Sequence, residues 1–478
     1  MNPELTTEQS EGSSPTYGSG ASRIFILCPS SFRSGVPLLL LHIGLDDTDS
    51  PRGGCTTYIA ALLVERLQEL GAKFIDYPNL VRLNPNVPWK TRGNGAVCLR
   101  VECDPALEGA IKEVVVDAVE SHAEFDCENT NPGIVFHTGA VPEPLGRFAC
   151  RVIQGVVSRE DAEGLIEGYC ASAIGYKNMR GIIGALAAVG ERLEGDHAYE
   201  FLAYRTPENR GMPRRLDVAS VMEMDEATRG ETFNNFDPEA RRPLIAPHGP
   251  DPVLFGVRGE SAEAVYRAGT MIRAEEPFER WVIFRTNQGT DAHLRRTSKI
   301  SDLKPYNPAI VAGEVAAHPR TIKGGHVIFP LRDETGEIDC AAYEPTGRFR
   351  DIARRLIPGD RVRAYGGIRS DGAGRRTLNL EKMEVLHLAP DIRLANPLCP
   401  KCGGGMESMG RGQGYRCRRC GLRDRNLRKR SIQMERKLTP GLYLPPPRSQ
   451  RHLTKPLQRY GKEKSRAPDG LFEPWHWP

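Results

Sequence analysis

Three aspartates, Asp46, Asp47 and Asp49, end the apolar run LLLLHIGL of residues 38–45. Carboxylates placed this closely repel one another unless a cation lies among them, and a hard, oxygen-liganded ion such as Mg²⁺ is the natural candidate. A solvated acidic turn is the alternative that the spacing leaves open. We therefore interpret the three aspartates as a candidate magnesium site.

A glycine turn and a helix start follow directly. Gly53 and Gly54 permit a tight turn, and Thr56 and Thr57 open a segment with the apolar spacing of an amphipathic helix. The first N–H groups of a helix lack intrahelical partners, so they can hold a phosphate. With magnesium nearby, this predicts a nucleoside triphosphate site without the GxxxxGK[ST] motif of a P-loop. A simple helix cap at Thr56 is the alternative.

Further polar clusters lie beside glycines, in GYKNMRG (175–181) and PRRLDVASV (213–221). Lys177 and Arg180 are candidates for contacts with phosphates, as is Arg258, and Asp217 is a candidate carboxylate of the same site. A surface ion pair explains each of these residues equally well.

Two CxxC pairs stand near the end of the chain, with fourteen residues between them. Four thiolates at this spacing converge on one zinc ion, and the glycine after each pair permits the tight turn that is needed. Because four thiolates leave no open coordination position, the zinc is structural and not catalytic. The predicted ligands are Cys399, Cys402, Cys417 and Cys420.

The charge is unevenly distributed. Between Arg411 and Arg466 there are 18 Lys and Arg against three acids, a net +15, so the rest of the chain carries −11 of the total of +4. A basic C-terminal end on a mildly acidic body points to a polyanionic partner, above all a nucleic acid. A solvated, disordered basic tail is the alternative.

The bulk composition predicts a multidomain cytoplasmic protein. A chain of 478 residues corresponds to roughly three or four domains. No apolar run approaches the roughly 18 residues of a membrane span, and a secretory signal is lacking. The cysteines outside the zinc pattern are scattered, as reduced thiols are. The first 36 residues, rich in Ser, Gly and Thr, predict a disordered extension.

The elements that position the candidate site are a buried strand over 38–45, a helix over 57–70, a strand over 95–103 and a helix over 106–123. Strands and helices alternate up to about residue 275, which predicts a mixed α/β or α+β catalytic body. From 281 to 388 short β-like runs, beginning with WVIFRTN, are separated by turn signals. These runs predict a small β-barrel of the OB type, with a generic β-sandwich as the alternative.

The chain resembles a known family in the order of its unusual motifs. It is similar to the archaeal tRNA(Ile) 2-agmatinylcytidine synthetases from about Leu38 to about Gly461, and its N-terminal extension departs from their pattern. The motifs that carry the resemblance are GLDDTDSPRGGCTTY, GYKNMRGIIGALAAVG, YEFLAYR, TFNNFD, PHGPDPVLFGVRGE, TNQGTDAHL and the cysteine pairs.

The resemblance implies a multidomain α+β architecture, with a kinase-like catalytic domain, a ferredoxin-like domain, an OB-fold barrel and a zinc ribbon. The predicted ranges are 1–36 for the extension, 37–130 for the first part of the catalytic domain, 131–275 for the ferredoxin-like domain and the remaining catalytic body, 276–390 for the OB-fold, 396–424 for the ribbon and 425–478 for a basic tail.

The resemblance also implies a reaction. The family joins agmatine to C2 of the wobble cytidine of an isoleucine tRNA with a CAU anticodon, so that AUA is read as isoleucine, and ATP ends as AMP and phosphates. Asp46, Asp47 and Asp49 match the family carboxylates for metal and ATP, and Thr56 matches the threonine that becomes phosphorylated. Thr57 is its neighbour in the motif.

This chemistry suits the residues. The C2 oxygen of cytosine is a poor leaving group until it is activated, and phosphorylation by a magnesium-bound triphosphate provides that activation. The wobble base must leave the anticodon loop to react, while barrel and ribbon hold the rest of the tRNA. A non-catalytic RNA-binding protein and a small-molecule kinase are the rival hypotheses.

Overall fold

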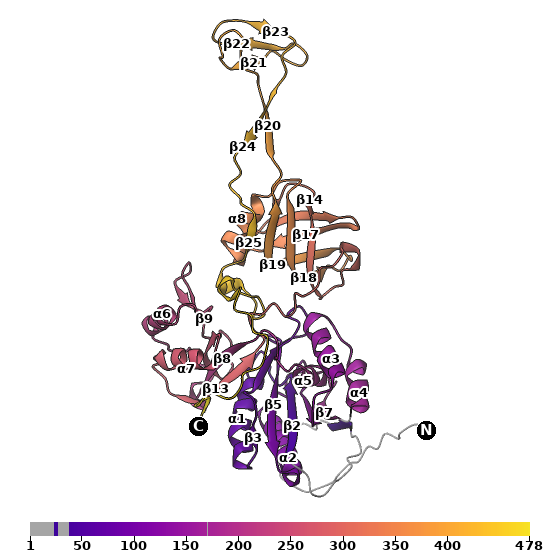
Figure 1. The fold of residues 1–478 in the computed structure, drawn as a ribbon, viewed down its shortest axis with the longest axis vertical. Coiled ribbons are helices and arrows are strands. Elements are labelled where there is room, and N and C mark those ends of the chain that lie inside the picture. Colours follow the sequence, from indigo (N-terminus) through magenta and orange to yellow (C-terminus); the bar gives the residue numbers. More distant parts are fainter. Residues whose placement is uncertain (1–22, 27–37, 170) are drawn as a thin grey trace, which may run out of the picture.

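The computed structural model describes residues 23–26, 38–169 and 171–478 as a broad body, a barrel above it and a small ribbon at the end of a thin stalk (Figure 1). Most of the predicted extension 1–36 lies outside these residues. Arg23–Ile26, which falls within it, forms strand β1 and pairs antiparallel with β7 (Ser172–Tyr176).

One mixed sheet of twelve strands runs through the body. The strand β13, from the run WVIFRTN, lies near its middle. The spatial order is β1, β7, β6 (Gly133–Thr138), β2 (Leu39–Asp46), β5 (Gly95–Cys103), β4 (Asn79–Arg82), β13 (Phe278–Thr286), β8 (Ala198–Arg205), β12 (Val253–Gly259) and β9 (Thr232–Phe233), with β3 (Lys73–Phe74) beside β5 and β26 (His476–Trp477) beside β13.

The two faces of this sheet are covered by different helices. Neighbouring residues of β5 face opposite cores, since Val97 and Leu99 belong to one and Ala96 and Cys98 to the other. Helices α1 (Thr56–Glu69), α2 (Glu108–His122), α6 (Val218–Ala227) and α7 (Ala262–Met271) build the first core, and α3 (Glu143–Gln154), α4 (Arg159–Gly168) and α5 (Gly181–Gly190) the second. Burial on both faces explains the unbroken apolar run that becomes β2, and the predicted strands and helices up to residue 123 are confirmed.

A closed barrel of five strands follows the body, as the OB prediction requires. The strand order of the barrel is β14 (Pro308–Val315), β18 (Arg361–Ser370), β19 (Arg376–His387), β17 (Gly336–Ala342) and β16 (Val327–Asp333), with β15 (Arg320–Thr321) beside β16 and β25 (Gly441–Tyr443) beside β19. β16 also pairs with β14, which closes the barrel, and helix α8 (Arg348–Arg354) packs against β16 and β17.

The barrel begins at Pro308 and not at residue 276. The run WVIFRTN forms β13, which pairs antiparallel with β8 and parallel with β4 in the sheet of the body. An apolar β-type run is suited to either sheet, so its composition could not decide between them. The split of the body into 37–130 and 131–275 stays a prediction, because one sheet runs through both ranges.

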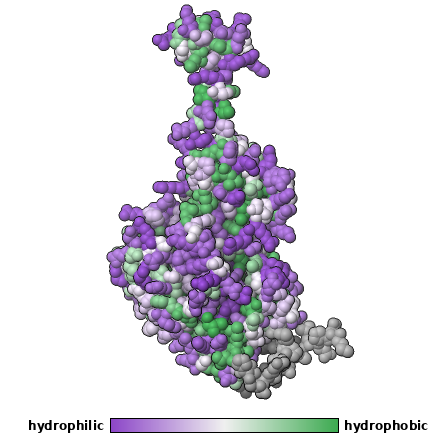
Figure 2. All heavy atoms as spheres, in the orientation of Figure 1, coloured by the Kyte–Doolittle hydropathy of each residue, from purple (hydrophilic) through white to green (hydrophobic). Residues whose placement is uncertain are grey.

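The stalk and the ribbon leave the barrel and return to it. β20 (Asp391–Ala395) and β24 (Arg430–Met434) pair antiparallel as the stalk, and the ribbon consists of β21 (Met406–Ser408), β22 (Tyr415–Cys417) and β23 (Arg423–Asp424). Figure 2 shows hydrophilic side chains over much of the ribbon and apolar ones on the stalk, where Ile392 and Leu394 are exposed. One further short ladder, β10 (Phe236–Asp237) with β11 (Arg242–Pro243), lies in the body.

Residues 425–478 are not a free basic tail. The chain adds β25 to the barrel and β26 to the body, and Leu453, Arg459 and Trp475 are buried. Arg459 forms ion pairs with Glu260 and Asp196 at 2.8 and 2.9 Å. Its charge therefore holds the C-terminal segment on the body, which a count of basic residues along the sequence cannot reveal.

The C-terminal segment should stabilise the body through Trp475, which contacts the rings of Phe74 and Tyr77 at centroid distances of 5.3 and 6.2 Å. We expect Trp475→Ala to lower the free energy of unfolding by about 3–5 kcal/mol, because it removes a buried aromatic ring. Trp477→Ala, at a ring that is half exposed, should cost less than about 1 kcal/mol. Urea denaturation of both variants measures the difference, and equal losses would contradict it.

Candidate active site and metal centre

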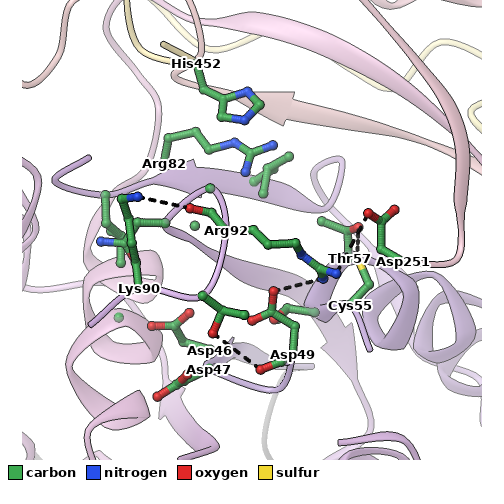
Figure 3. A pocket seen from close by; sticks show the side chains of 18 of the residues that line it. Asp46, Asp47, Asp49, Cys55, Thr57, Arg82, Lys90, Arg92, Asp251 and His452 are labelled. Atoms are coloured by element: carbon green, nitrogen blue, oxygen red, sulfur yellow. Dashed lines mark hydrogen bonds and ion pairs between the residues drawn. The ribbon is translucent and has the colours of Figure 1, made fainter. Parts of the chain in front are cut away.

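A cavity of about 390 Å³ lies where the two halves of the large sheet meet (Figure 3). The carboxyl end of β2, the first turn of α1, the segment 82–95 and strands β8 and β12 all contribute to its lining. It brings together seven residues predicted from the sequence, which are Asp46, Asp47, Asp49, Thr56, Thr57, Arg180 and Arg258.

The local fold gives the aspartates little freedom. Asp46 is the last residue of β2, and its Oδ2 lies so close to α5 that a Cβ at Gly184 would come within 1.9 Å of it. Asp47 adopts a left-handed φ of 58°. Gly54 has a φ of 74°, and a Cβ there would lie 2.7 Å from Cγ of Glu124. Both glycines are therefore required for the turn to approach its neighbours.

Two arginines neutralise two of the three aspartates. Arg180 Nη2 donates to Asp47 Oδ2 at 2.7 Å, and Arg92 Nη2 lies 2.8 Å from Asp49 Oδ2. Among the described residues Asp46 forms no ion pair. Burial, followed by the charges of Asp47 and Asp49, raises its pKa well above the ordinary value. Burial also raises the pKa of Asp47 and of Asp49, although the arginines oppose it. The three aspartates are thus paired with only two cations.

The aspartates do not form a three-carboxylate cage. Across residues 23–26, 38–169 and 171–478, the four cysteines are the one group of three or more His, Cys, Asp or Glu side chains whose ligand atoms all lie within 4.8 Å of one another. Asp47 and Asp49 turn towards their arginines instead. Mg²⁺ in nucleotide sites usually takes one or two protein carboxylates and completes its shell with phosphate oxygens and water, and these residues fit that type of site.

The helix start beside the aspartates is open to an anion. Cys55 is the N-cap residue of α1 and makes no side-chain capping bond, and the first turn contains no acid. Thr56 is therefore the first helical residue and not the cap. Its Oγ1 lies 2.9 Å from Oγ1 of the buried Thr48, and Thr57 Oγ1 lies 3.0 Å from the Cys55 sulfur. The uncapped N–H groups can bind phosphate oxygens.

Three residues predicted to bind the cofactor, Gly53, Gly54 and Lys177, lie outside the cavity lining. Gly53 and Gly54 form the turn behind the lining, where Ser50 N donates to Gly53 O at 2.8 Å. Lys177 donates from Nζ to the carbonyl oxygens of Phe125 and Cys127 at 2.6 and 2.7 Å, and it lies outside the cavity lining. Its charge serves a loop, which the cluster of polar residues in the sequence did not indicate.

Asp217 also lies outside the cavity lining. It is the N-cap of α6, accepts a hydrogen bond from Ala219 N at 2.9 Å and pairs with Arg273 at 2.8 Å. An aspartate before a helix is commonly a cap, and here this ordinary role explains the residue.

Sequence reasoning missed much of the charged lining. The segment WKTRGNG (89–95) supplies Lys90 and Arg92. A basic pair beside glycines is the same signal that drew attention to Arg180. Arg258, which the sequence did single out, lines the cavity. The missed charged or titratable residues are Arg82, Lys90, Arg92, Glu200, Asp251 and His452.

Some of these residues form one hydrogen-bonded network, which is buried at Glu200 and Gln288 and exposed at His452. Glu200 accepts a hydrogen bond from Arg258 Nε at 2.9 Å and another from Gln288. Gln288 Oε1 in turn lies 3.1 Å from Nδ1 of His452, which the C-terminal segment delivers to the cavity. The charges of Arg82 and Arg258 hold the pKa of His452 below its ordinary value.

The ribbon holds the four cysteines at the geometry of a zinc site. Cys399 Sγ lies 3.5 Å from Cys420 Sγ, and Cys402 Sγ lies 3.5 Å from Cys417 Sγ. Tetrahedral zinc with bonds of about 2.3 Å needs sulfurs about 3.8 Å apart. The donor set and its spacing fit a structural zinc ion, and every cysteine that the structure describes is free of a disulfide.

Comparison with known proteins matches four domain families along the chain. Residues 42–106 match the TiaS TCKD domain and residues 179–293 the TiaS FLD domain. Residues 309–386 match an OB-fold nucleic acid binding domain, and residues 396–438 match the TiaS C-terminal zinc ribbon domain.

Two similar proteins are the tRNA(Ile) 2-agmatinylcytidine synthetases TiaS of Methanosarcina mazei and Methanocaldococcus jannaschii. The first is 46% identical over 425 residues, covering 87% of this chain and 97% of the relative, and the second is 44% identical over 427 residues, covering 88% and 99%. The chain belongs to the tRNA(Ile) 2-agmatinylcytidine synthetase family. The resemblance inferred from the motifs is thereby confirmed.

Solved structures of this family match the whole architecture. A complex of TiaS with its isoleucine tRNA and ATP has a TM-score of 0.80 and 41% identity, covering 91% of this chain and 99% of that one. A complex of TiaS with the tRNA, AMPCPP and agmatine has a TM-score of 0.78 and 39% identity over the same shares. Among the described residues of the present chain, no helix has the length and apolar character needed to cross a bilayer.

The unpaired charge of Asp46 should destabilise the ligand-free protein. Because its folded pKa is raised, the folded chain binds the proton more tightly than the unfolded chain, and stability falls as pH rises through that pKa. Asp46→Asn should therefore raise the thermal midpoint at neutral pH, with a gain that shrinks as pH falls. Asp217→Asn, at a carboxylate whose pKa Arg273 lowers, should give no gain. A pH series of thermal melts tests this, and a lower midpoint for Asp46→Asn at neutral pH would contradict it.

Zinc removal should affect the ribbon alone, because only the stalk joins it to the rest of the chain (Figure 1). We expect Cys417→Ser to lose the one bound zinc while the thermal midpoint of the body stays within about 1 °C, since metal binding folds such small sites locally. Cys150→Ser, at an exposed free cysteine, should keep the zinc. Metal analysis and calorimetry measure both effects, and a shifted body transition in Cys417→Ser would contradict the local role.

Proposed function

We propose that this chain is an ATP-dependent ligase that joins agmatine to C2 of the wobble cytidine of an isoleucine tRNA with a CAU anticodon. The observation that carries the proposal is identity of 44–46% with synthetases of this activity over nearly their whole length. The cavity that gathers Asp46, Asp47, Asp49 and Thr56 supports it. The cytoplasm, where tRNA is modified, is the proposed location.

The chemistry requires activation of a poor electrophile. Phosphorylation of the C2 oxygen turns it into a leaving group, and attack by the agmatine amine then forms the C–N bond and releases phosphate. Mg²⁺, when bound, would neutralise the triphosphate. Asp46, which has no ion-pair partner, is the first candidate ligand for the metal. Asp47 and Asp49 could bind it only if the metal displaced the arginines that now pair with them.

The start of α1 is suited to phosphoryl transfer. Its uncapped N–H groups and Arg180 can hold phosphate oxygens, and Thr56 Oγ1 stands at the same place. Thr48 fixes that hydroxyl by a buried hydrogen bond of 2.9 Å. Thr56 is therefore the proposed acceptor of a phosphoryl group. Thr57 is a lesser candidate, because its hydroxyl is hydrogen-bonded to the Cys55 sulfur.

The cavity also suits a dication. Agmatine carries two positive charges and needs carboxylates, and Glu200 and Asp251 add two to the same lining. The tRNA itself would lie on barrel and ribbon, where Arg411, Arg416 and Arg419 form no ion pair with other described residues. The RNA-binding hypothesis without catalysis leaves the gathering of these charged side chains in one cavity unexplained.

One reconstitution tests the proposal. Purified protein, tRNA transcript, labelled agmatine, ATP and Mg²⁺ should give labelled 2-agmatinylcytidine on nucleoside analysis, and omission of ATP should abolish it. Thr56→Val should lose self-phosphorylation and at least 100-fold of product formation, on the order of 3 kcal/mol, while Thr56→Ser should retain both in part. Asp47→Asn should stop ATP turnover. RNA binding without product from the folded wild type would leave only the RNA-binding hypothesis.

A further inference from the structure

An exposed tryptophan stands at the mouth of the cavity. Trp89 lines the cavity with 40% of its surface exposed, whereas Trp281 and Trp475 are buried. Asn129 holds its backbone by donating to Trp89 O at 2.8 Å. Within the described residues no aromatic ring stacks on its indole. Its exposed face is therefore available to a ligand with a flat ring.

Cations from three parts of the chain surround this ring's segment. Lys90 follows Trp89, Arg369 comes from β18 of the barrel, and Arg451 comes from the C-terminal segment, where its Nη1 donates to Pro85 O at 3.0 Å. The barrel approaches this loop directly, since a Cβ at Gly367 would lie 2.0 Å from Asn86 Oδ1.

The positive charge of these three side chains is only partly balanced. Arg451 pairs with Glu381 at 3.1 Å, but Lys90 and Arg369 form no ion pair with any residue that the structure describes. Burial, followed by the charges of Arg451 and Arg369, lowers the pKa of Lys90. An anion bound between Lys90, Arg369 and Arg451 would balance their charge and would favour the protonated form of Lys90.

An aromatic face beside unbalanced cations matches one kind of ligand best. Unpaired nucleotides stack their bases on aromatic side chains while Lys and Arg hold their phosphates. The two positive charges of agmatine disfavour it beside these cations, and the carboxylates and helix start that suit ATP belong to less exposed parts of the lining than Trp89.

We propose that Trp89 is the stacking platform for an unstacked base next to the reacting cytidine, and that Lys90, Arg369 and Arg451 hold the phosphates beside it. The inference rests on the proposed function, because it requires an anticodon loop that opens at the cavity. It makes Trp89 a residue that positions the RNA and takes no part in the bond-forming steps.

Tryptophan fluorescence tests the platform. The chain has four tryptophans, of which Trp89 and Trp477 are the exposed ones. An anticodon stem-loop RNA with the CAU sequence should quench the wild type and Trp477→Phe alike, and Trp89→Phe should lose most of that quenching while still binding the RNA. Undiminished quenching in Trp89→Phe would overturn the proposal. Quenching of Trp89 by ATP or agmatine alone would overturn it as well, because the ring would then serve that ligand.

Affinity measurements supply a second readout. Trp89→Ala should weaken binding of the stem-loop roughly 5- to 150-fold, the range for one stacked base, and Trp89→Phe should weaken it much less. Lys90→Ala should reduce the slope of log affinity against log salt by about 0.7, whereas Arg375→Ala, at an exposed arginine paired with Asp371, should leave it unchanged. Wild-type affinity in Trp89→Ala would overturn the platform. Absence of RNA binding by the wild type would instead overturn the proposed function itself.

Discussion

The crowding of three carboxylates at the end of β2 is the constraint on which the site depends. Asp46, Asp47 and Asp49 are half-buried, and burial raises the pKa of each, with a further rise from neighbouring carboxylates at Asp46 and Asp49. Arg180 and Arg92 reach them from the start of α5 and from the segment 82–95. Those two arginines therefore tie the acidic turn to two separate parts of the fold, and one carboxylate is still left for a cation.

The rest of the architecture holds the elements that line this charged cavity in place. β13 pairs with β4 on one side and with β8 on the other, so a single strand joins the two halves of the sheet around the cavity. The C-terminal segment crosses the same junction, where Arg459 pairs with Glu260 and Asp196. It carries His452 and Arg451 into the region between body and barrel. The last residues of the chain are thus part of the site's construction.

What the sequence could predict follows from how local each signal is. The strand that ends at Asp46, the helix that begins at Thr56 and the zinc cysteines are encoded within short stretches, and the structure agrees with all three. Glu200 reaches the cavity only because β8 pairs with the distant strands β12 and β13, which no local pattern contains. The same is true of β13, because the composition of an apolar run does not indicate which strand it pairs with. Asp217 caps α6 outside the cavity lining, and its sequence pattern did not separate these roles because capping and catalysis use the same side chain.

The paired cations of the C-terminal segment also change how its charge must be understood. A net of +15 between Arg411 and Arg466 suggests one continuous surface for RNA. However, Lys455, Arg459 and Lys464 pair with carboxylates of the body or of their own segment and are not available to phosphates. The unpaired positive charge of this range therefore lies largely on the ribbon, and the unpaired cations at the mouth of the cavity, Lys90 and Arg369, come from other parts of the chain. Two separated basic regions, joined by a rigid barrel, are suited to holding a long RNA at two points while one of its bases enters the cavity.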